Sequence, residues 1–256
     1  MNDNRAKSRN MTLASLVFGA AVFLTGYVLR ERASPLTLGT HAEFPPFEHR
    51  EEPGGRIVGF DMELARAVAE KAGRALRVVD MPFEDLIPAL EEGEVDFVMV
   101  AMTVTPERAK RVDFSRPYYR ATQVAMLRAG DPEPASKEEL GDRRIGAQSG
   151  TTSYAWAREI AGAANAKALP TARAAAQALA NGEVDCILVD EQPAAALAKN
   201  IPGLKIVRIP FEVEEYAAAV RKGNRGLLET IDRTLEELVA DGRHEWFVDR
   251  WMVMPQ

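Results

Sequence analysis

The sequence contains one cysteine, Cys186, and only three histidines in 256 residues. A single cysteine excludes an intramolecular disulfide and every zinc or iron–sulfur pattern that needs several cysteines. The histidines (His41, His49 and His244) show no metal-ligand spacing, so the sequence implies no cofactor. Cysteine content therefore leaves the redox compartment of the protein undetermined.

The chain also lacks a long run of basic residues. It carries 32 Lys and Arg against 38 Asp and Glu, which gives a formal net charge of -6. Because no stretch can neutralise a row of phosphates, we do not expect nucleic acid as a partner. The hydrophobic fraction of 46% is too high for an intrinsically disordered chain, so a packed core is expected.

Charge is absent from residues 11–29, a run that Arg5, Lys7 and Arg9 precede. A secretory signal has an apolar run of about 7–15 residues, whereas a membrane-spanning helix needs about 20. The run therefore favours an uncleaved anchor with a cytoplasmic N-terminus and an exported remainder, with a cleaved signal peptide as the alternative. Tyr27 stands where a lipoprotein would carry its lipidated cysteine, so lipidation there is excluded.

After residue 35, short β-like runs alternate with amphipathic helical runs, which is typical of an α/β protein. The pattern predicts strands at residues 36–39, 77–79, 96–100, 144–147, 184–189 and around 216–221, with an extended run at 121–128. It predicts helices at residues 61–72, 83–92, 106–112, 154–164, 172–181, 224–240 and around 244–251.

Residues 89–100 recur as residues 178–189, with seven of the twelve positions identical. Each copy is typical of a helix end, a glycine stop and a buried parallel strand, so each half of the chain is predicted to form the same kind of α/β lobe. Two lobes imply a cleft. Ligands of open α/β sheets bind beyond the carboxyl ends of strands, which here places Ala101, Thr103 and Asp190 at the cleft.

Thr105 and the proline that follows it predict the start of a helix, with threonine as the N-cap. A helix N-terminus offers free N–H groups to an anion. Arg108, one turn into this helix, can add a planar two-pronged donor for a carboxylate, with the Thr103 hydroxyl beside it. The alternative role for Arg108 is an exposed salt bridge to Glu107 or Asp113.

Four segments now carry a family resemblance: GFDMELARAVAEKAG at residues 59–73, FEDLIPAL at 83–90, MTVTPER at 102–108 and VDFSRPYY at 112–119. In order and spacing they resemble the periplasmic polar amino-acid-binding proteins of bacterial ABC importers, solute-binding protein family 3. The resemblance covers nearly all of the chain after the apolar run. It implies a two-lobed α/β periplasmic-binding-protein fold with two hinge strands, here preceded by one N-terminal transmembrane or signal helix.

The resemblance also implies a division of the chain. Residues 1–34 are the signal-anchor segment, residues 35–122 and 212–256 form lobe 1, and residues 123–211 form lobe 2 with the hinge strands. Hinge candidates are residues 121–128 outward and 206–216 on return. We expect a monomer in the periplasmic or extracytoplasmic space, tethered to the inner membrane by residues 11–29.

Site residues follow from the same resemblance. In the family, the residues that match Arg108 and Thr103 hold the ligand's α-carboxylate, and the aspartate that matches Asp190 faces the α-ammonium. Phe44 and Phe83 match aromatic rings around the ligand's side chain, although both could be ordinary core residues. The other predicted ligand-binding residues are Ala101, Gln148, Thr152 and His41; Gln148 to Thr152 can complete the carboxylate site from lobe 2.

These assignments predict a binding protein with no catalytic residues. A free polar L-amino acid would select the closed form by bridging both lobes, and the closed form would deliver it to an ABC permease and its ATPase. An alternative is a periplasmic enzyme on the same fold, a lyase similar to cyclohexadienyl or arogenate dehydratase, which needs a cleft acid protonated near neutral pH. A membrane-tethered sensor ectodomain is the other alternative.

The identity of the amino acid depends on the far end of the pocket. Family members that take cationic ligands commonly have an acid three positions before the first pocket aromatic, and His41 stands there instead. A largely neutral imidazole supplies no negative charge, so we expect glutamine-like ligands ahead of lysine and arginine. The sequence leaves open whether Glu43, Glu84 or Glu191 reaches the pocket.

Overall fold

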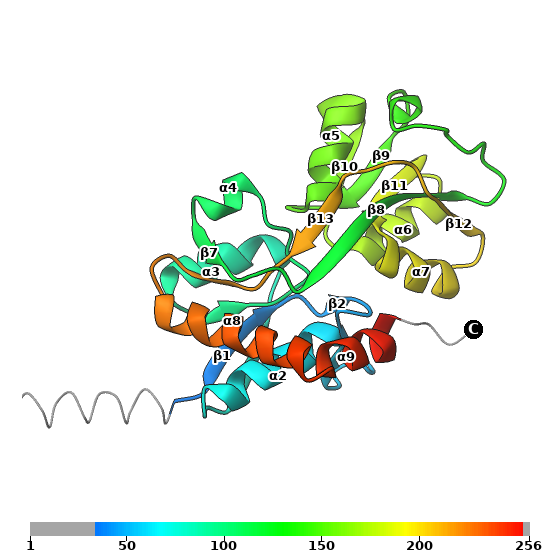
Figure 1. Cartoon of the computed structure of the whole chain (residues 1–256). Coiled ribbons are helices and arrows are strands. Elements are labelled where there is room, and N and C mark those ends of the chain that lie inside the picture. The colour runs from blue at the N-terminus through cyan, green and yellow to red at the C-terminus, as the bar shows by residue number, and fades with distance from the viewer. Residues whose placement is uncertain (1–33, 253–256) are drawn as a thin grey trace, which may run out of the picture.

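The structure is a computed structural model that describes residues 34–252. Two α/β lobes lie on either side of a pair of crossing strands, β8 (Tyr119–Arg128) and β13 (Val213–Tyr216) (Figure 1). The predicted anchor at residues 11–29 lies outside the described residues. Among residues 34–252, no helix combines the length and the apolar composition that crossing a membrane would need.

The sheet of lobe 1 has the strand order β5-β1-β6-β14-β7. Its strands are β1 (Leu36–Thr40), β5 (Leu76–Asp80), β6 (Phe97–Val98), β7 (Val112–Phe114) and β14 (Ala219–Arg221). Strands β5, β1 and β6 are parallel, and β14 enters antiparallel between β6 and β7. The C-terminal part of the chain therefore completes this sheet.

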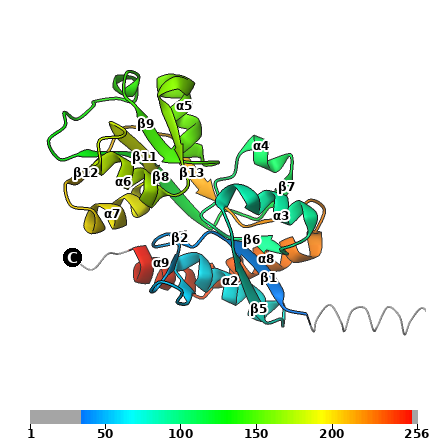
Figure 2. The same ribbon diagram turned by 180° about the vertical axis from the view of Figure 1, so that it is seen from behind.

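Helices cover both faces of the lobe 1 sheet. The helices α2 (Phe60–Lys71), α8 (Arg225–Ala240) and α9 (Arg243–Met252) pack on one face, and α3 (Leu86–Glu92), which follows the 3₁₀ turn η1 (Phe83–Asp85), packs on the other (Figure 2). Residues 97–100 alternate between these faces: Phe97 and Met99 join the core under α2, and Val98 and Val100 join the core under α3. This alternation is why the strand is a continuous apolar run.

The sheet of lobe 2 has the order β10-β9-β11-β8-β12. Its strands are β9 (Ile145–Gln148), β10 (Ala166–Leu169), β11 (Cys186–Asp190) and β12 (Leu204–Val207) beside β8, and its helices are α5 (Thr152–Asn165), α6 (Ala172–Ala180) and α7 (Glu191–Asn200). A short 3₁₀ turn, η2 (Glu138–Leu140), precedes β9. Strand β8 runs antiparallel to β11 and β12, so only β9, β10 and β11 form a parallel core.

The two crossing strands pair with each other between the lobes. The register of β13 on the first half of β8 runs from Val213 opposite Thr122 to Tyr216 opposite Tyr119. The predicted hinge segment 121–128 lies within β8, and the predicted segment 206–216 contains the end of β12 and all of β13. The predicted lobe boundaries fall inside β8 and just before β13.

Lobe 1 also carries a small hairpin sheet and a short helix beside the cleft. Strands β2 (Glu43–Phe44), β3 (Glu48–Arg50) and β4 (Ile57–Val58) form the small sheet, and α4 (Pro106–Ala109) is the short helix. Gly59 lets the chain turn from β4 into α2, since a Cβ at this glycine would lie 2.1 Å from the Phe47 carbonyl oxygen. That close approach brings β3 against α2.

Several sequence predictions of secondary structure are wrong in detail. The predicted helix 106–112 ends at Ala109, because Val112 begins a strand that pairs with β14. Helix α7 and strands β10 and β12 were not predicted. Helix α7 begins immediately after β11 and carries Pro193 in its first turn. Backbone N–H groups in the first turn have no acceptor within the helix, so proline costs no hydrogen bond there. The strand expected around 216–221 is divided, since Tyr216 belongs to β13 and β14 begins at Ala219.

Candidate functional site

A cavity with an empty volume of about 350 Å³ lies where the two lobes meet. All nine predicted ligand-binding residues line it: His41, Phe44, Phe83, Ala101, Thr103, Arg108, Gln148, Thr152 and Asp190. They come from segments between the first strand of lobe 1 and the last parallel strand of lobe 2. The fold therefore brings together, at one place, residues that are up to 149 positions apart (190 − 41).

Arg108 is held at the lobe 1 side of the cavity by its helix and its own side-chain bonds. The Thr105 hydroxyl caps α4 by accepting the Arg108 backbone N–H at 3.2 Å. The guanidinium donates to the Thr103 carbonyl (2.6 Å) and to the Gly150 carbonyl of lobe 2 (3.0 Å), and it lies 5.3 Å from the Phe83 ring centre. Burial lowers the pKa of Arg108, and the charge of Glu214 raises it. Two of its N–H groups are used, so others are free to meet a ligand carboxylate.

Asp190 ends strand β11 on the lobe 2 side and is buried. The Gln123 amide donates to its carboxylate at 3.1 Å. Desolvation and the nearby charge of Glu214 raise the pKa of Asp190 to about 7, while the neighbouring Tyr216 hydroxyl and the charge of Arg108 lower it. A cationic group placed against this carboxylate would favour its ionised form.

The hydroxyls of Thr103 and Thr152 meet at one acceptor. Both donate to the same carboxylate oxygen of Glu214, at 2.5 Å and 2.8 Å. Thr103 lies in lobe 1, and Thr152 is the first residue of α5 in lobe 2. Each hydroxyl has one proton, so in this arrangement neither hydroxyl donates to a ligand. The expectation that Thr103 holds a ligand carboxylate therefore requires its hydroxyl to turn, or its backbone to serve instead.

The aromatic and amide side chains form the walls of the cavity. Phe44 is half-buried and packs against the cores of both lobes, and its ring lies 6.1 Å from that of Phe47. Phe83 is half-buried over the α3 core of lobe 1. Gln148 is buried at the end of β9, where its backbone carbonyl accepts the Thr151 hydroxyl at 2.7 Å. These residues can enclose the apolar part of a ligand.

The His41 ring has a defined orientation. Its Nδ1 lies 3.0 Å from the Met81 carbonyl, so Nδ1 carries the proton and donates it. Its Nε2 is buried and has no hydrogen-bond partner within the described part of the chain. In the neutral ring Nε2 is an acceptor, which suits a ligand group that donates.

Glu48 is an acid in the cavity wall that the sequence reasoning did not consider. It belongs to β3, is fully buried, and neither of its carboxyl oxygens receives a hydrogen bond from a donor in residues 34–252. Its carboxyl group contacts that of Asp61, and desolvation, followed by the charge of Asp61, raises the pKa of Glu48 well above its usual range. Glu43, Glu84 and Glu191, the acids left open above, are not among the residues that line this cavity.

Asp61 anchors the strand end that carries Ala101. Its carboxylate accepts the Ala101 N–H and the Tyr118 hydroxyl, each at 2.7 Å. Ala101 has a φ of 46°, a left-handed conformation that costs a non-glycine residue about 1–2 kcal/mol. Burial raises the pKa of Asp61 to about 6, and its hydrogen bonds oppose that rise. Asp61 thus receives two hydrogen bonds, whereas Glu48 receives none from residues 34–252.

Cross-lobe contacts hold the cavity closed. The Arg108 guanidinium reaches the Gly150 carbonyl, and the Ser149 hydroxyl donates to the Glu84 carboxylate at 2.7 Å. Glu84 therefore serves the contact between the lobes. Glu191 instead forms an ion pair with Arg208 at 2.6 Å.

Three residues at the site were missed by the sequence analysis: Glu48, Val100 and Glu214. Thr151, which also lines the cavity, belongs to the predicted segment from Gln148 to Thr152. Val100 is the direct neighbour of the predicted Ala101, so including flanking positions would have found it. Glu48 follows the Pro-Pro-Phe turn after Phe44 and lies opposite Phe44 in the antiparallel pair of β2 and β3. This pairing depends on the turn, so strand alternation along the sequence does not identify Glu48. No local signal distinguishes Glu214 from Glu212 and Glu215.

Comparison with known proteins agrees with this geometry. The family described as "Bacterial extracellular solute-binding proteins, family 3" matches residues 36–254. The arginine-binding extracellular protein ArtP of Bacillus subtilis (strain 168) is 34% identical over 221 residues, covering 84% of this chain and 85% of ArtP.

Two similar solved structures bear on the ligand. One is described as an ancestral arginine-binding protein bound to arginine and is 40% identical; the other is described as an ancestral arginine-binding protein bound to glutamine and is 39% identical. Each has a TM-score of 0.81 over 86% of this chain and 99% of its own. An ancestral amino-acid-binding protein, AncCDT-1, described as a precursor of cyclohexadienyl dehydratase, is 32% identical with a TM-score of 0.79 over 89% of this chain and 99% of its own. The matched family spans both lobes and the residues of the cavity, and the chain therefore belongs to family 3 of the bacterial extracellular solute-binding proteins.

Proposed function

We propose that this protein captures a free L-amino acid between its lobes and delivers it to the permease and ATPase of an ABC importer. The observation that carries the proposal is the placement of Arg108 and Asp190 on opposite lobes across one cavity. An α-carboxylate pairs with a guanidinium and an α-ammonium with a carboxylate, so a zwitterion satisfies both lobes only when they are closed. The names of the relatives, which bind arginine or glutamine, support the ligand class.

For the ligand's side chain, we propose a cationic group of the guanidinium type. The expectation of a neutral ligand rested on His41, which supplies no negative charge, and on Gln148, whose amide suits a neutral polar end group. Glu48 adds two buried carboxyl oxygens that have no donor within the described range 34–252. A guanidinium can donate to both of them and to Nε2 of His41. Burial raises the pKa of Glu48, and a cation beside it would favour the ionised form.

Calorimetry tests the ligand class directly. The protein would be titrated with L-arginine, L-lysine and L-glutamine, and L-arginine is expected to bind most tightly. Glu48→Gln should lower the affinity for arginine by about tenfold to a hundredfold and change the affinity for glutamine by less than about threefold. Glu43→Gln, an exposed neighbour on β2, is the control and should change neither. Glutamine tighter than arginine in the wild type would contradict the cationic assignment and leave the amino-acid binding standing.

A second candidate function is the lyase on the same fold. It is favoured by one observation: the cleft holds acids with raised pKa values, Asp190 at about 7 and Glu48 above its usual range, as an acid catalyst needs. The likeness to AncCDT-1 points the same way. We propose binding without catalysis, because both acids also suit ion pairs with a zwitterionic, cationic ligand. Incubation with prephenate and arogenate should give no aromatic product; turnover would overturn this.

We further propose that the protein acts outside the cytoplasm as a monomer, tethered to the inner membrane by residues 11–29. The support is the uncharged run with its basic N-terminal flank. Membrane fractions from the native host should contain the protein at the intact mass of the full chain. A soluble exported form that begins near Pro35 would show that the segment is a cleaved signal peptide.

A further inference from the structure

Glu214 is a buried acid in the strand that returns between the lobes. Strand β13 alternates exposed and buried residues, with Val213 and Glu215 exposed and Glu214 and Tyr216 buried. This two-residue period directs the Glu214 side chain to the inner side of the crossing strands. Buried carboxylates are stable only with partners that supply hydrogen bonds or charge, so its contacts indicate its role.

The partners of Glu214 come from lobe 1, from lobe 2 and from the crossing strand β8. One oxygen accepts the hydroxyls of Thr103 in lobe 1 (2.5 Å) and Thr152 in lobe 2 (2.8 Å). The other oxygen faces the Gln123 amide of β8 at 3.5 Å. Gln123 in turn donates to Asp190 and accepts the Ser153 hydroxyl at 2.9 Å. We call the group of Glu214, Thr103 and Thr152 the Glu214 bridge.

The Glu214 bridge combines two hydrogen bonds with nearby charged groups. Two hydroxyl donors point at one oxygen, and hydrogen bonds to a carboxylate are roughly twice as strong as neutral ones. Arg108 lies near enough for the charge of Glu214 to act on its guanidinium. The titratable and charged groups that act on one another here are thus Arg108, Asp190 and Glu214, with Tyr216 beside them.

The position of the bridge differs from that of the other cross-lobe contacts. The Arg108–Gly150 and Ser149–Glu84 bonds join one lobe directly to the other. Glu214 lies on a crossing strand and bonds to both lobes at once. Opening of the cleft therefore has to break at least one of its two hydroxyl bonds.

We propose that Glu214 is a positioning residue for lobe closure: its carboxylate joins Thr103 to Thr152 and so stabilises the closed arrangement before any amino acid binds. The bridge uses protein groups only, so the inference extends the proposed capture mechanism and does not depend on which ligand is taken. A protein with a larger closed fraction binds its ligand more tightly, because the apparent dissociation constant is divided by the fraction of competent molecules.

The test measures the distance between the lobes without ligand. Spin labels would be attached to Lys110→Cys on lobe 1 and Glu159→Cys on lobe 2, both exposed positions. Cys186 is buried, and burial raises the pKa of its thiol to about 12, so the native cysteine does not compete for the label. Glu214→Gln should lower the ratio of closed to open molecules about tenfold.

Three variants make the result specific. Glu215→Gln, the exposed neighbour that lies 3.7 Å from Arg120, is the matched control and should leave the distances unchanged. Thr152→Val removes the lobe 2 arm of the bridge and should also favour the open form, which keeps the proposal testable if Glu214→Gln does not fold. The double variant Glu214→Gln/Thr152→Val should open no further than Glu214→Gln alone, because both changes break the same bond.

Binding measurements complete the test. Glu214→Gln should lower the affinity for the amino acid about tenfold. Unchanged distances in Glu214→Gln would overturn the proposal, and so would a shift to the closed form with tighter binding, which would mean that Glu214 competes with the ligand for the two hydroxyls. Changed distances in a protein that binds no amino acid would support the bridge and refute the proposed function.

Discussion

Residues 89–100 of lobe 1 and residues 178–189 of lobe 2 share both sequence and backbone. In each copy a helix ends at a glycine in the left-handed region, Gly93 with a φ of 79° and Gly182 with a φ of 75°. The second residue of each turn then donates its N–H back into the helix, from Glu94 and from Glu183, at 2.9 Å in both copies. The repeat is therefore one supersecondary unit used twice.

The repeated aspartate has the same structural task in both lobes. Asp96 accepts the N–H of Thr37 at 2.7 Å, and Asp185 accepts the N–H of Arg144 at 2.9 Å. Each bond ties the turn before one strand to the start of its parallel neighbour. The carboxylate thereby satisfies a backbone donor that lies just before the strand pairing begins, where the neighbouring strand offers no carbonyl for it.

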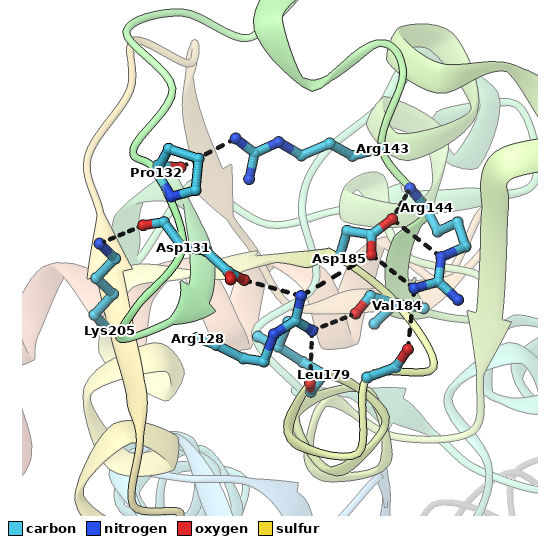
Figure 3. Close-up of polar contacts among 10 residues, drawn as sticks. Arg128, Asp131, Pro132, Arg143, Arg144, Leu179, Val184, Asp185 and Lys205 are labelled. Carbon is cyan, nitrogen blue, oxygen red and sulfur yellow. Dashed lines mark hydrogen bonds and ion pairs between the residues drawn. The ribbon is translucent and has the colours of Figure 1, made fainter.

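The surroundings of the two aspartates differ. In lobe 2, the Arg144 side chain donates to both oxygens of Asp185, and Arg128 bridges the carbonyls of Leu179 and Val184 (Figure 3). In lobe 1, Asp96 has a longer contact of 3.5 Å with Arg74. Both copies pack into an apolar core, and the copy in lobe 2 has more charged partners around its aspartate than the copy in lobe 1.

The largest difference lies directly after the repeat. The lobe 1 strand continues into Ala101 and Thr103 and on to Arg108, which supplies positive charge, whereas the lobe 2 strand ends at Asp190, which supplies negative charge. A shared scaffold therefore presents opposite charges to one cavity. The comparison indicates that the repeat provides the fold and that the residues just beyond it provide recognition.

Replacing Arg108, which supplies the positive charge, should have the largest effect on ligand affinity. Arg108→Ala leaves a ligand carboxylate desolvated without its partner, so affinity should fall by about 2–5 kcal/mol, roughly 30-fold to several thousand-fold. Arg111→Ala, an exposed arginine paired with Glu91, is the control and should bind as the wild type does. Calorimetry measures both, with circular dichroism to check folding. Binding by Arg108→Ala within about threefold of wild type would remove the central assignment.

Replacing Asp190, which supplies the negative charge, should weaken ligand binding but raise the stability of the ligand-free protein. The pKa of Asp190 is about 7 in the folded protein against a usual 3.8, so the folded state holds a proton that the unfolded chain releases. The stability of the ligand-free protein should therefore fall as the pH rises from about 4 to 7. Asp190→Asn removes that decline and should raise the Tm by several degrees at pH 8, while it weakens amino-acid binding at least about tenfold.

Thermal melts of the wild type and Asp190→Asn at pH 5 and pH 8 test this. The gap in Tm between the two proteins should be wider at pH 8 than at pH 5, because at pH 5 Asp190 keeps its proton. Glu48 and Asp61 also have raised pKa values and add to the decline of both proteins, so the difference between the proteins is the quantity to compare. An equal gap at both pH values would contradict the burial argument for Asp190.

The strand ends and the residues after them could be predicted from the sequence. Asp190 directly follows the repeated strand, and Arg108 lies in the first turn of a helix with a recognisable N-cap. Both patterns can be read from short stretches of sequence. Glu214 could not be predicted, since its partner Thr103 is 111 positions away and the register of β13 on β8 decides which glutamate faces inward. Glu212, Glu214 and Glu215 all lie in this segment. The sequence therefore shows no alternation of polar and apolar residues that would identify the buried glutamate. Glu48 was missed for a related reason, because its burial depends on the packing of β3 against α2.

The two aspartates of the repeat predict a stability difference. Hydrogen bonding by Arg144, more than any other contact, lowers the pKa of Asp185 to about 2. This contribution to stability is present above about pH 4 and is lost as the pH falls towards 2. Asp185→Asn should cost about 1–2 kcal/mol at pH 7, and Asp96→Asn about 0.5–1 kcal/mol, because partly exposed ion pairs are weakened by solvent.

Urea denaturation at pH 7 and pH 3.5 measures the difference between these variants. The cost of Asp185→Asn should shrink at the lower pH, and neither variant should change amino-acid affinity, since neither side chain reaches the cavity. A larger cost for Asp96→Asn would show that the backbone bond to Thr37 outweighs the charged surroundings of lobe 2.

The smallest expected effect concerns two glycines of lobe 2 with the same backbone conformation. Gly150 and Gly182 both have a φ of 75°, but a Cβ on Gly150 would lie 3.3 Å from the Cβ of Glu84 in lobe 1, whereas a Cβ on Gly182 would meet nothing within 4 Å. Alanine at either position should cost about 1–2 kcal/mol of stability through backbone strain. Only Gly150→Ala also crowds the closed lobes, so only this variant should weaken amino-acid binding, by about threefold to tenfold. Calorimetry at matched temperature, well below both Tm values, separates the two effects. Equal affinities in the two alanine variants would show that the lobes accommodate the added methyl group without opening.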